Sequence, residues 1–331
     1  MNDIKVTVWC LAYNHEKYIR SALDGFVMQK TNFAYEVLVH DDASTDRTAE
    51  IIREYEEKYP DIIKPIYEKE NQYRSGKNYA TSFLLPNAKG KYIAYCEGDD
   101  YWTDENKLQR AYDVLEAHEN VYMCVHKVKC TNEDDTPNSE VHPPKKAKLN
   151  GDTLLTPEEM AALVWEKVGY VFQTSSFVIR KEVLQTRVVH ELFGKITGDE
   201  RIIRSAMSLG CVYYIDRVMS CRRLWTIGNY NSRQREKTNE ERMVQQLRTL
   251  DAELLYDEMM EGRFHKYIIP SAYRMLLSDI RFTDPQTIRK IDIQYRNEHR
   301  FSLFTSKKTF IAHVLFTFSP AFYKYLIMKR T

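Results

Sequence analysis

Three carboxylates stand within four residues of the chain, at Glu97, Asp99 and Asp100, directly after the apolar segment 92–96. Like charges so close together repel one another unless a cation is bound. Oxygen ligands of this kind suit Mn²⁺ or Mg²⁺, which usually fill their other positions with water and substrate phosphates. The segment therefore predicts a metal and phosphate site. The alternative is a solvated turn, because Gly-Asp-Asp also favours turns.

A second acidic pair, Asp41 and Asp42, follows another apolar segment, 35–39. Ser44, two residues later, is a typical helix-capping residue. Capping accounts for Ser44 but leaves the two adjacent carboxylates unexplained. A carboxylate here is able to accept a hydrogen bond from a nucleobase N–H group or a ribose hydroxyl, so we expect a nucleotide contact.

The elements that must position these residues alternate between strands and helices. Apolar runs predict strands over 4–11, 35–39, 62–67 and 92–96. Helical spacing predicts helices capped by Asn14, Ser44 and Asp104, and a short one over 78–85. This alternation indicates right-handed βαβ units and a mostly parallel α/β sheet, whose carboxyl edge binds ligands.

The pattern loosens beyond residue 130. Residues 131–152 are rich in Asp, Asn, Pro and Lys, and they predict an exposed excursion. Further on we expect a helix over 157–165, a strand over 177–180, a helix after Gly198, a strand pair over 212–221 and helices from about 240. The polar segment 173–176 is expected either to line a binding site or to form a buried polar turn.

Four motifs stand in order over about the first hundred residues: Val8-x-x-Leu11-Ala12-Tyr13-Asn14, Asp41-Asp42-Ala43-Ser44-Thr45-Asp46, Glu70-Asn71 with Asn78, and Glu97-Gly98-Asp99-Asp100. In this order and spacing the chain resembles the family-2 glycosyltransferases. The resemblance implies an inverting enzyme with a GT-A fold, a Rossmann-like sheet flanked by helices. It also implies a catalytic domain over 1–235, with a nucleotide-sugar half to about 130 and an acceptor half from 131. A helical C-terminal region over 236–331 would follow.

The resemblance implies a role for each matching position. Contacts to a nucleotide-diphosphate sugar would come from Leu11 (through its backbone), Tyr13, Asp42, Asn71 and Lys77. Asp99 and Asp100 would hold Mn²⁺ or Mg²⁺ on the diphosphate and the sugar. Glu97 stands where the family usually has Asp, so it would contact either the metal or the donor sugar.

Inverting transfer also needs one general base, which takes the proton of the acceptor hydroxyl. The family places a carboxylate well downstream of the metal motif, where this chain has Asp199 and Glu200. We take Asp199 as the base and Glu200 as the alternate; an N-terminal helix charge is the other interpretation. Arg222 matches an arginine of the family, and its donor fork suits a diphosphate. The His that commonly follows is absent from Cys221-Arg222-Arg223-Leu224-Trp225.

Charge is balanced overall but distributed unevenly. The 331 residues include 48 Lys and Arg against 47 Asp and Glu, and a net charge of +1 argues against sequence-wide nucleic-acid binding. Residues 299–331 carry six basic and no acidic side chains among many aromatic ones. Such a tail predicts contact with an anionic membrane surface. The alternative is a helix pair packed on the catalytic domain or on the second subunit of a homodimer.

Six cysteines, none in a C-x-x-C pair, predict buried, reduced thiols in a cytoplasmic protein. The N-terminus does not read as a signal peptide, and no apolar run is long enough to span a membrane. We therefore expect a peripheral protein on the inner face of the cell membrane. The spacing of Cys124, His126 and Cys130 raises the possibility of zinc, but a strand with inward cysteines is favoured because no second ligand pair has metal spacing.

The resemblance implies transfer from a UDP-linked donor to a glycan or lipid-linked acceptor in capsule, exopolysaccharide or teichoic acid synthesis. A nucleotidyltransferase is one alternative, but it normally carries a Gly-rich basic loop where this chain has Leu11-Ala12-Tyr13-Asn14-His15. A non-catalytic nucleotide-sugar-binding scaffold protein is another. The presence of carboxylates at every expected position argues against it.

Overall fold

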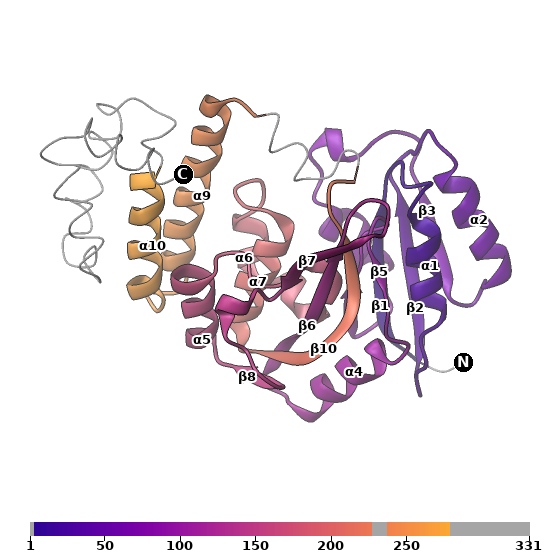
Figure 1. Ribbon diagram of the computed structural model, residues 1–331, viewed down its shortest axis with the longest axis horizontal. Coiled ribbons are helices and arrows are strands. Elements are labelled where there is room, and N and C mark those ends of the chain that lie inside the picture. The colour runs from indigo at the N-terminus through magenta and orange to yellow at the C-terminus, as the bar shows by residue number, and fades with distance from the viewer. Residues whose placement is uncertain (1–2, 227–236, 279–331) are drawn as a thin grey trace, which may run out of the picture.

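A computed structural model describes residues 3–226 and 237–278 (Figure 1). The first half of its sheet is parallel, in the order β3-β2-β1-β4. The register places Val8 of β1 between Val37 of β2 and Ala94 of β4. Strand interiors are apolar because helices cover both faces of this sheet, as is usual for parallel strands. The four strands are β1 (Ile4–Ala12), β2 (Ala34–Asp41), β3 (Ile63–Tyr67) and β4 (Tyr92–Tyr95).

The second half of the sheet is mixed. Strand β9 lies antiparallel between β4 and β6, and β10 runs parallel to β6. The short strands β5, β7 and β8 pair antiparallel with β10, β6 and β10, respectively. The expected α/β class is therefore confirmed. The bounds are β5 (Tyr101–Trp102), β6 (Val121–Thr131), β7 (Pro137–His142), β8 (Thr153–Leu155), β9 (Val178–Arg180) and β10 (Cys211–Arg223).

Two sequence expectations about strands were wrong. The pair expected over 212–221 is one long strand, β10, whose pairing with β6 shifts register twice between Ile215 and Ser220. The excursion over 131–152 contains β7, which folds back on β6 as a hairpin. The side chains of β7 are mostly polar and at least partly exposed, so the sequence carries no apolar pattern from which this strand could be predicted.

Helices form a layer on each face of the sheet (Figure 1). Helices α1, α2 and α4 share one apolar core with β1, β2 and β4, while the opposite face packs on α5, α6 and α7. The helices are α1 (Ile19–Val27), α2 (Thr48–Lys58), α3 (Leu85–Asn87), α4 (Lys107–Ala117), α5 (Pro157–Ala161), α6 (Arg187–Glu191) and α7 (Gly198–Leu209). Short 3₁₀ and π segments are η1 (Tyr73–Ser75), η2 (Ala80–Leu84), η3 (Lys145–Ala147), η4 (Ala162–Lys167), η5 (Thr174–Ser176) and η6 (Lys181–Gln185).

Asn14 and Ser44 do not cap helices as expected. Helix α1 begins only at Ile19, and Asn14 adopts a left-handed backbone conformation with φ 56°. Its Oδ1 accepts a hydrogen bond from the Thr45 N–H at 2.8 Å, and its own N–H donates to Ser44 Oγ at 2.9 Å. Both side chains therefore tie the end of β1 to the end of β2. Asp104 likewise lies before the cap of α4, which is Asn106.

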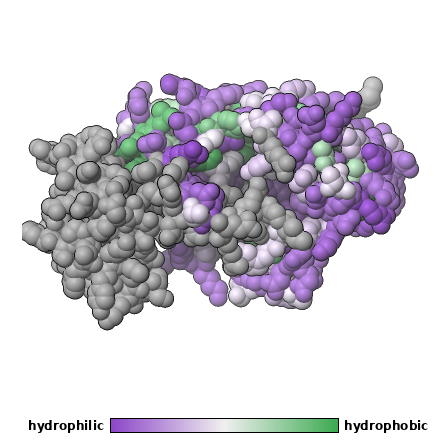
Figure 2. Space-filling view, turned by 90° about the horizontal axis from the view of Figure 1, so that it is seen from above, coloured by the Kyte–Doolittle hydropathy of each residue, from purple (hydrophilic) through white to green (hydrophobic). Residues whose placement is uncertain are grey.

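Two further helices, α9 (Asn239–Met259) and α10 (His265–Ser278), follow the sheet. Tyr256 and Phe264 stack with their ring centroids 5.8 Å apart, and both belong to the core that contains α7. No helix within 3–226 or 237–278 is long and apolar enough to cross a membrane. Seen from above, the described surface is mainly hydrophilic, with apolar residues gathered in one band (Figure 2). The basic tail 299–331 lies outside the described residues.

Candidate active site

The acidic segment forms a tight turn held against the end of β1. Gly98 donates its N–H to the Leu11 carbonyl at 2.8 Å, and Asp100 donates its N–H to the Glu97 carbonyl at 3.0 Å. A Cβ atom at Gly98 would lie 2.8 Å from His15 Nδ1, closer than real contacts allow. A larger residue at this position would have to displace the His15 and Ile19 side chains and would press on the Leu11 carbonyl, 3.2 Å away, so glycine favours the close approach of the turn to β1. The backbone of Leu11, which is expected to contact the nucleotide, supports this turn through its carbonyl.

Asp100 is the buried anchor of the turn. Its Oδ1 accepts the backbone N–H of Arg223 at 3.0 Å, and its Oδ2 accepts Nε2 of Gln173 at 3.0 Å. Burial, followed by the negative charges of Asp99 and Glu97, raises the pKa of Asp100 well above its usual value. Gln173 and the serines at 175 and 176 are all buried, so this segment matches the buried polar turn.

Asp99 and Glu97 are the more accessible carboxylates of the turn. Asp99 is half-buried, and its Oδ2 accepts the Thr226 hydroxyl at 2.8 Å. Glu97 keeps an exposed side chain, yet desolvation by the surrounding protein, followed by the charges of Asp99 and Asp199, raises its pKa to about 7. Carboxylates placed so close that negative charge raises the pKa of Glu97 fit a divalent cation, which would relieve that repulsion. Asp99 and Glu97 are thus the residues of this turn best placed to hold Mn²⁺ or Mg²⁺.

Arg223 organises the site, although the sequence analysis assigned a role only to its neighbour Arg222. It is buried and makes a two-pronged ion pair with Asp135, with Nε–Oδ1 at 2.7 Å and Nη2–Oδ2 at 3.0 Å. Its Nη1 also donates to the Asp99 carbonyl at 2.9 Å. Arg223 therefore clamps the acidic turn to the β6–β7 hairpin. A second arginine directly after the expected diphosphate contact Arg222, at the end of a strand, was the available signal.

Asp199 lies at the N-terminus of α7, next to the N-cap residue Thr197. Glu200 closes the cap, because its Oε2 accepts the Thr197 N–H at 3.1 Å and the Thr197 hydroxyl at 2.8 Å. Burial raises the pKa of Asp199, while hydrogen bonds from Thr197 and Tyr170 oppose that rise. The negative charge of Asp199 also raises the pKa of Glu97, so the N-terminus of α7 lies near the acidic turn. Both carboxylates therefore take part in the cap, Glu200 through Oε2 and Asp199 through Oδ1, and Asp199 in addition acts on the pKa of Glu97.

Arg222 and Tyr170 occupy the space between these groups. The Arg222 guanidinium lies 5.9 Å from the centre of the Tyr170 ring. Arg222 lowers the pKa values of Glu97 and Asp100, so it contributes positive charge where a diphosphate would add negative charge. Tyr170 was missed by the sequence analysis, because a lone tyrosine after a glycine carries no distinguishing pattern.

The residues expected to contact the nucleotide do not all lie in the same kind of environment. Asp42 is buried, and its oxygens accept the Gln72 N–H at 2.6 Å, the Tyr73 N–H at 3.2 Å and the Tyr79 hydroxyl at 2.8 Å. Asn71 Nδ2 donates to the Asp42 carbonyl at 3.3 Å, and Lys77 Nζ donates to Gln72 Oε1 at 2.7 Å. Tyr13 is exposed at the end of β1. The structure therefore gathers Asp42, Asn71 and Lys77 around one loop, with the Asp42 carboxylate engaged by that loop.

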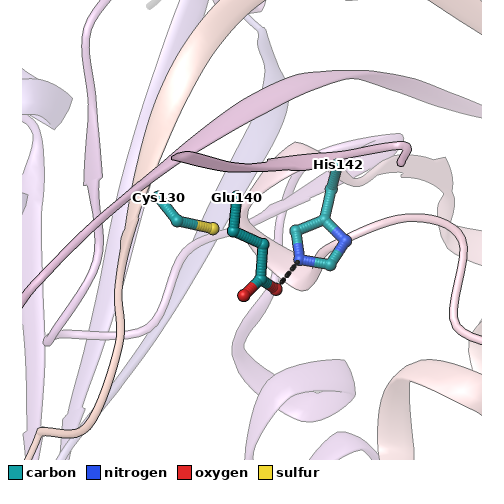
Figure 3. Close-up of side chains that lie close together, drawn as sticks. All are labelled: Cys130, Glu140 and His142. Atoms are coloured by element: carbon teal, nitrogen blue, oxygen red, sulfur yellow. Dashed lines mark hydrogen bonds and ion pairs between the residues drawn. The ribbon is translucent and has the colours of Figure 1, made fainter. Parts of the chain in front are cut away.

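All six cysteines are buried and free, as expected. Cys130 does not join Cys124 and His126: it lies beside Glu140 and His142, and their ligand atoms are within 4.8 Å of one another (Figure 3). Within the described residues this is the one group of at least three His, Cys, Asp or Glu side chains whose ligand atoms come this close together. The favoured interpretation of Cys124 and His126, as inward residues of a strand, agrees with their burial in β6.

The chain thus combines a mostly parallel α/β sheet with a turn of carboxylates after β4, at the carboxyl edge of the sheet. Residues 7–187, more than half of the chain, match the family Glycosyl transferase family 2. The chain therefore belongs to glycosyltransferase family 2.

Known relatives share this region. An uncharacterised protein of Mycobacterium tuberculosis is 42% identical over 151 residues, which cover 45% of this chain and 43% of that protein. The chain thus matches less than half the length of this relative. The poly(ribitol-phosphate) beta-N-acetylglucosaminyltransferase TarS of Staphylococcus aureus is 32% identical over 139 residues, covering 41% of this chain and 23% of TarS.

Solved structures show the same fold. Residues 1–349 of TarS in complex with UDP-GlcNAc give a TM-score of 0.59 at 16% identity, covering 92% of this chain and 93% of that chain. GalNAc-T7 with UDP, GalNAc and Mn²⁺ gives a TM-score of 0.53 at 14% identity, covering 97% of this chain and 57% of that one. The GT-A fold expected from the motifs is confirmed.

Proposed function

We propose that this protein is a metal-dependent inverting glycosyltransferase that uses a nucleotide-diphosphate sugar. The observation that carries the proposal is that Asp199 lies near enough to Glu97 for its charge to raise the pKa of Glu97, while Glu200 Oε2 is occupied in the helix cap. In this proposal the carboxylates of the acidic turn serve the donor diphosphate, and Asp199 at the start of α7 serves the acceptor. That division is what a single-displacement transfer requires.

Each group has a defined task in this reaction. Asp199 takes the proton of the acceptor hydroxyl as that oxygen attacks the anomeric carbon from the face opposite the diphosphate. Its raised pKa makes it a stronger base than an ordinary aspartate. The Thr197 hydroxyl and the Glu200 N–H both donate to its Oδ1 and fix its orientation. Arg222 stabilises the negative charge on the departing diphosphate. When bound, Mn²⁺ or Mg²⁺ supplies charge neutralisation on that diphosphate.

The metal ligands follow from hydrogen bonding around the turn. Both oxygens of Asp100 already accept hydrogen bonds from the protein, so we assign Asp100 to holding the turn together with Arg223. Asp99, with Glu97 beside it, is then the principal metal ligand. The family resemblance named Asp99 and Asp100 together, and the difference between them is open to direct measurement.

Donor and acceptor are inferred from relatives. TarS is named as an N-acetylglucosaminyltransferase acting on poly(ribitol-phosphate) and was solved with UDP-GlcNAc. We therefore propose a UDP-linked sugar as donor and a cell-surface polysaccharide or its lipid-linked precursor as acceptor. Such an acceptor fits a cytoplasmic protein held at the inner membrane surface through the basic residues 299–331.

Incubation with a panel of UDP- and GDP-sugars and Mn²⁺ tests this function. Slow hydrolysis should release the nucleoside diphosphate from one donor class, and chelation of the metal should stop the release. The Asp99→Asn variant should release none, whereas Asp113→Asn, exposed on α4, should behave as wild type. Binding of a donor without any release, with or without added glycan acceptors, would instead indicate a scaffold protein.

A further inference from the structure

The β6–β7 hairpin brings a second set of metal-ligand residues together, away from the acidic turn. His142 pairs with Val128 and Val141 pairs with Lys129 across the two strands. Because side chains alternate along a strand, Cys130, Glu140 and His142 share one face of the hairpin. Figure 3 shows the three side chains converging, with Glu140 Oε1 3.1 Å from His142 Nε2.

The protein surrounds this cluster asymmetrically. Cys130 and His142 are only 2% and 6% exposed, and within the described residues His142 Nδ1 has no hydrogen-bond partner. The Glu140 side chain is 49% exposed, so the cluster opens to solvent on one side. Two buried ligands with one accessible carboxylate allow an ion to enter and then be largely enclosed.

Ligand chemistry identifies the ion. A thiolate, an imidazole and a carboxylate are the three ligand types of zinc sites, whereas the acidic turn offers only oxygen. We propose that Cys130, Glu140 and His142 bind one zinc ion, with a fourth position left to water. Zinc bonds of about 2.0 to 2.3 Å place tetrahedral ligands about 3.5 Å apart, so ligand atoms within 4.8 Å need only small rotations.

Protonation of the ligands sets a condition on binding. Burial, together with the charge of Glu140, raises the pKa of the Cys130 thiol to about 12. The thiol must therefore lose its proton to solvent as the zinc–sulfur bond forms. Nearby Arg222 favours the ligand forms of both partners, because it lowers the pKa of the thiol and of His142. The two anionic ligands offset its repulsion of the cation.

The zinc site would connect to the active site through Tyr170. The His142 and Tyr170 rings meet edge to face with centroids 5.5 Å apart, and Tyr170 is one of the groups that lower the pKa of Asp199. Fixing His142 on a metal would fix the surface on which Tyr170 rests. The proposed role of zinc is thus to position Tyr170, and not to take part in transfer.

Cobalt titration of the reduced, metal-free full chain tests the proposal. Co²⁺ bound by a thiolate gives a near-ultraviolet charge-transfer band, which oxygen ligands at the acidic turn do not produce. The band should saturate at one equivalent and disappear when one equivalent of Zn²⁺ is added. It should persist in Asp99→Asn and in Cys124→Ser, a buried cysteine elsewhere on β6.

Variants of the ligands complete the experiment. Cys130→Ser should abolish the band. Glu140→Gln, at an exposed position, should keep the fold by circular dichroism and weaken Zn²⁺ binding by more than about 100-fold, since even outer-shell partners are worth 10- to 100-fold. The absence of a band in folded wild-type protein would overturn the proposal, as would a band that survives Cys130→Ser.

Discussion

The backbone N–H of Arg223 donates to Asp100 Oδ1 at 3.0 Å, and this bond joins the end of β10 to the acidic turn across 123 residues of sequence. The Arg223 side chain then returns to the Asp99 carbonyl at 2.9 Å. The shape of the acidic turn therefore depends on a strand far away in the chain.

This relationship predicts different roles for the two aspartates: Asp100 stabilises the fold, and Asp99 binds the metal. Asp100→Ala leaves a buried N–H and the Gln173 amide without their acceptor, so we expect a loss of about 1–3 kcal/mol in the free energy of unfolding. Asp99→Asn should change stability little and abolish Mn²⁺-dependent UDP binding. Urea unfolding and calorimetry of the same proteins measure both effects. Equal stability losses in the two variants would contradict the assignment.

The strands β1, β2 and β4 could be predicted from the sequence because each is a short apolar run that is followed at once by polar residues. Val6, Val8 and Cys10 are fully buried, and the chain leaves the core where Asn14 begins the loop. Such a change from apolar to polar is a local feature, readable without a fold. The positions of Glu97, Asp99 and Asp199 at one site followed from the family resemblance, since they come from distant elements.

Contacts made between elements could not be predicted. Asn14 and Ser44 have the chemistry of caps, but each found a partner on the neighbouring loop instead. Cys130 was grouped with Cys124 and His126 by sequence proximity, while strand pairing placed it beside Glu140 and His142. In both cases local propensity was overridden by a neighbour that only the folded sheet supplies.

The raised pKa of Glu97 predicts a pH dependence of binding. Protonation removes a negative charge beside the metal position, so Mn²⁺-dependent UDP affinity should fall below about pH 7, by up to about tenfold per pH unit. Glu97→Gln should bind more weakly above pH 7 and lose this dependence. Calorimetry across the range measures it. A wild-type affinity independent of pH between about 6 and 8 would contradict it.

The same shift has the opposite effect on the stability of the free protein. Because the folded chain holds a proton on Glu97 at pH values where the unfolded chain has lost it, ionised Glu97 destabilises the fold. That destabilisation begins above the ordinary value of 4.5 and is complete above about pH 7. In metal-free buffer Glu97→Gln should therefore raise Tm at about pH 8 and leave it unchanged at about pH 4.

A buried ion pair links the helix that carries Asp199 to α9. Arg204 of α7 binds Glu253, whose Oε2 also accepts Trp165 Nε1 at 3.0 Å, and both charged groups are buried. Glu253→Gln keeps an acceptor for Trp165 but leaves the Arg204 charge without its partner, so unfolding should become easier by about 3–5 kcal/mol.

The exposed pair Arg187–Glu191, with 3.4 Å between Nε and Oε1, provides the matched control. Glu191→Gln should change the free energy of unfolding by less than about 0.5 kcal/mol. Urea unfolding of both variants makes the comparison. Equal effects would mean that α9 does not stabilise α7 through this pair.

The most direct test compares Asp199→Asn with Glu200→Gln for nucleoside diphosphate release and for Mn²⁺-dependent UDP binding. Glutamine can still close the helix cap, so Glu200→Gln should retain most of the activity. Asp199→Asn should lose more than about 100-fold in turnover, the usual contribution of a general base, and bind UDP within about threefold of wild type. Full turnover by Asp199→Asn, or loss of activity only in Glu200→Gln, would contradict the account.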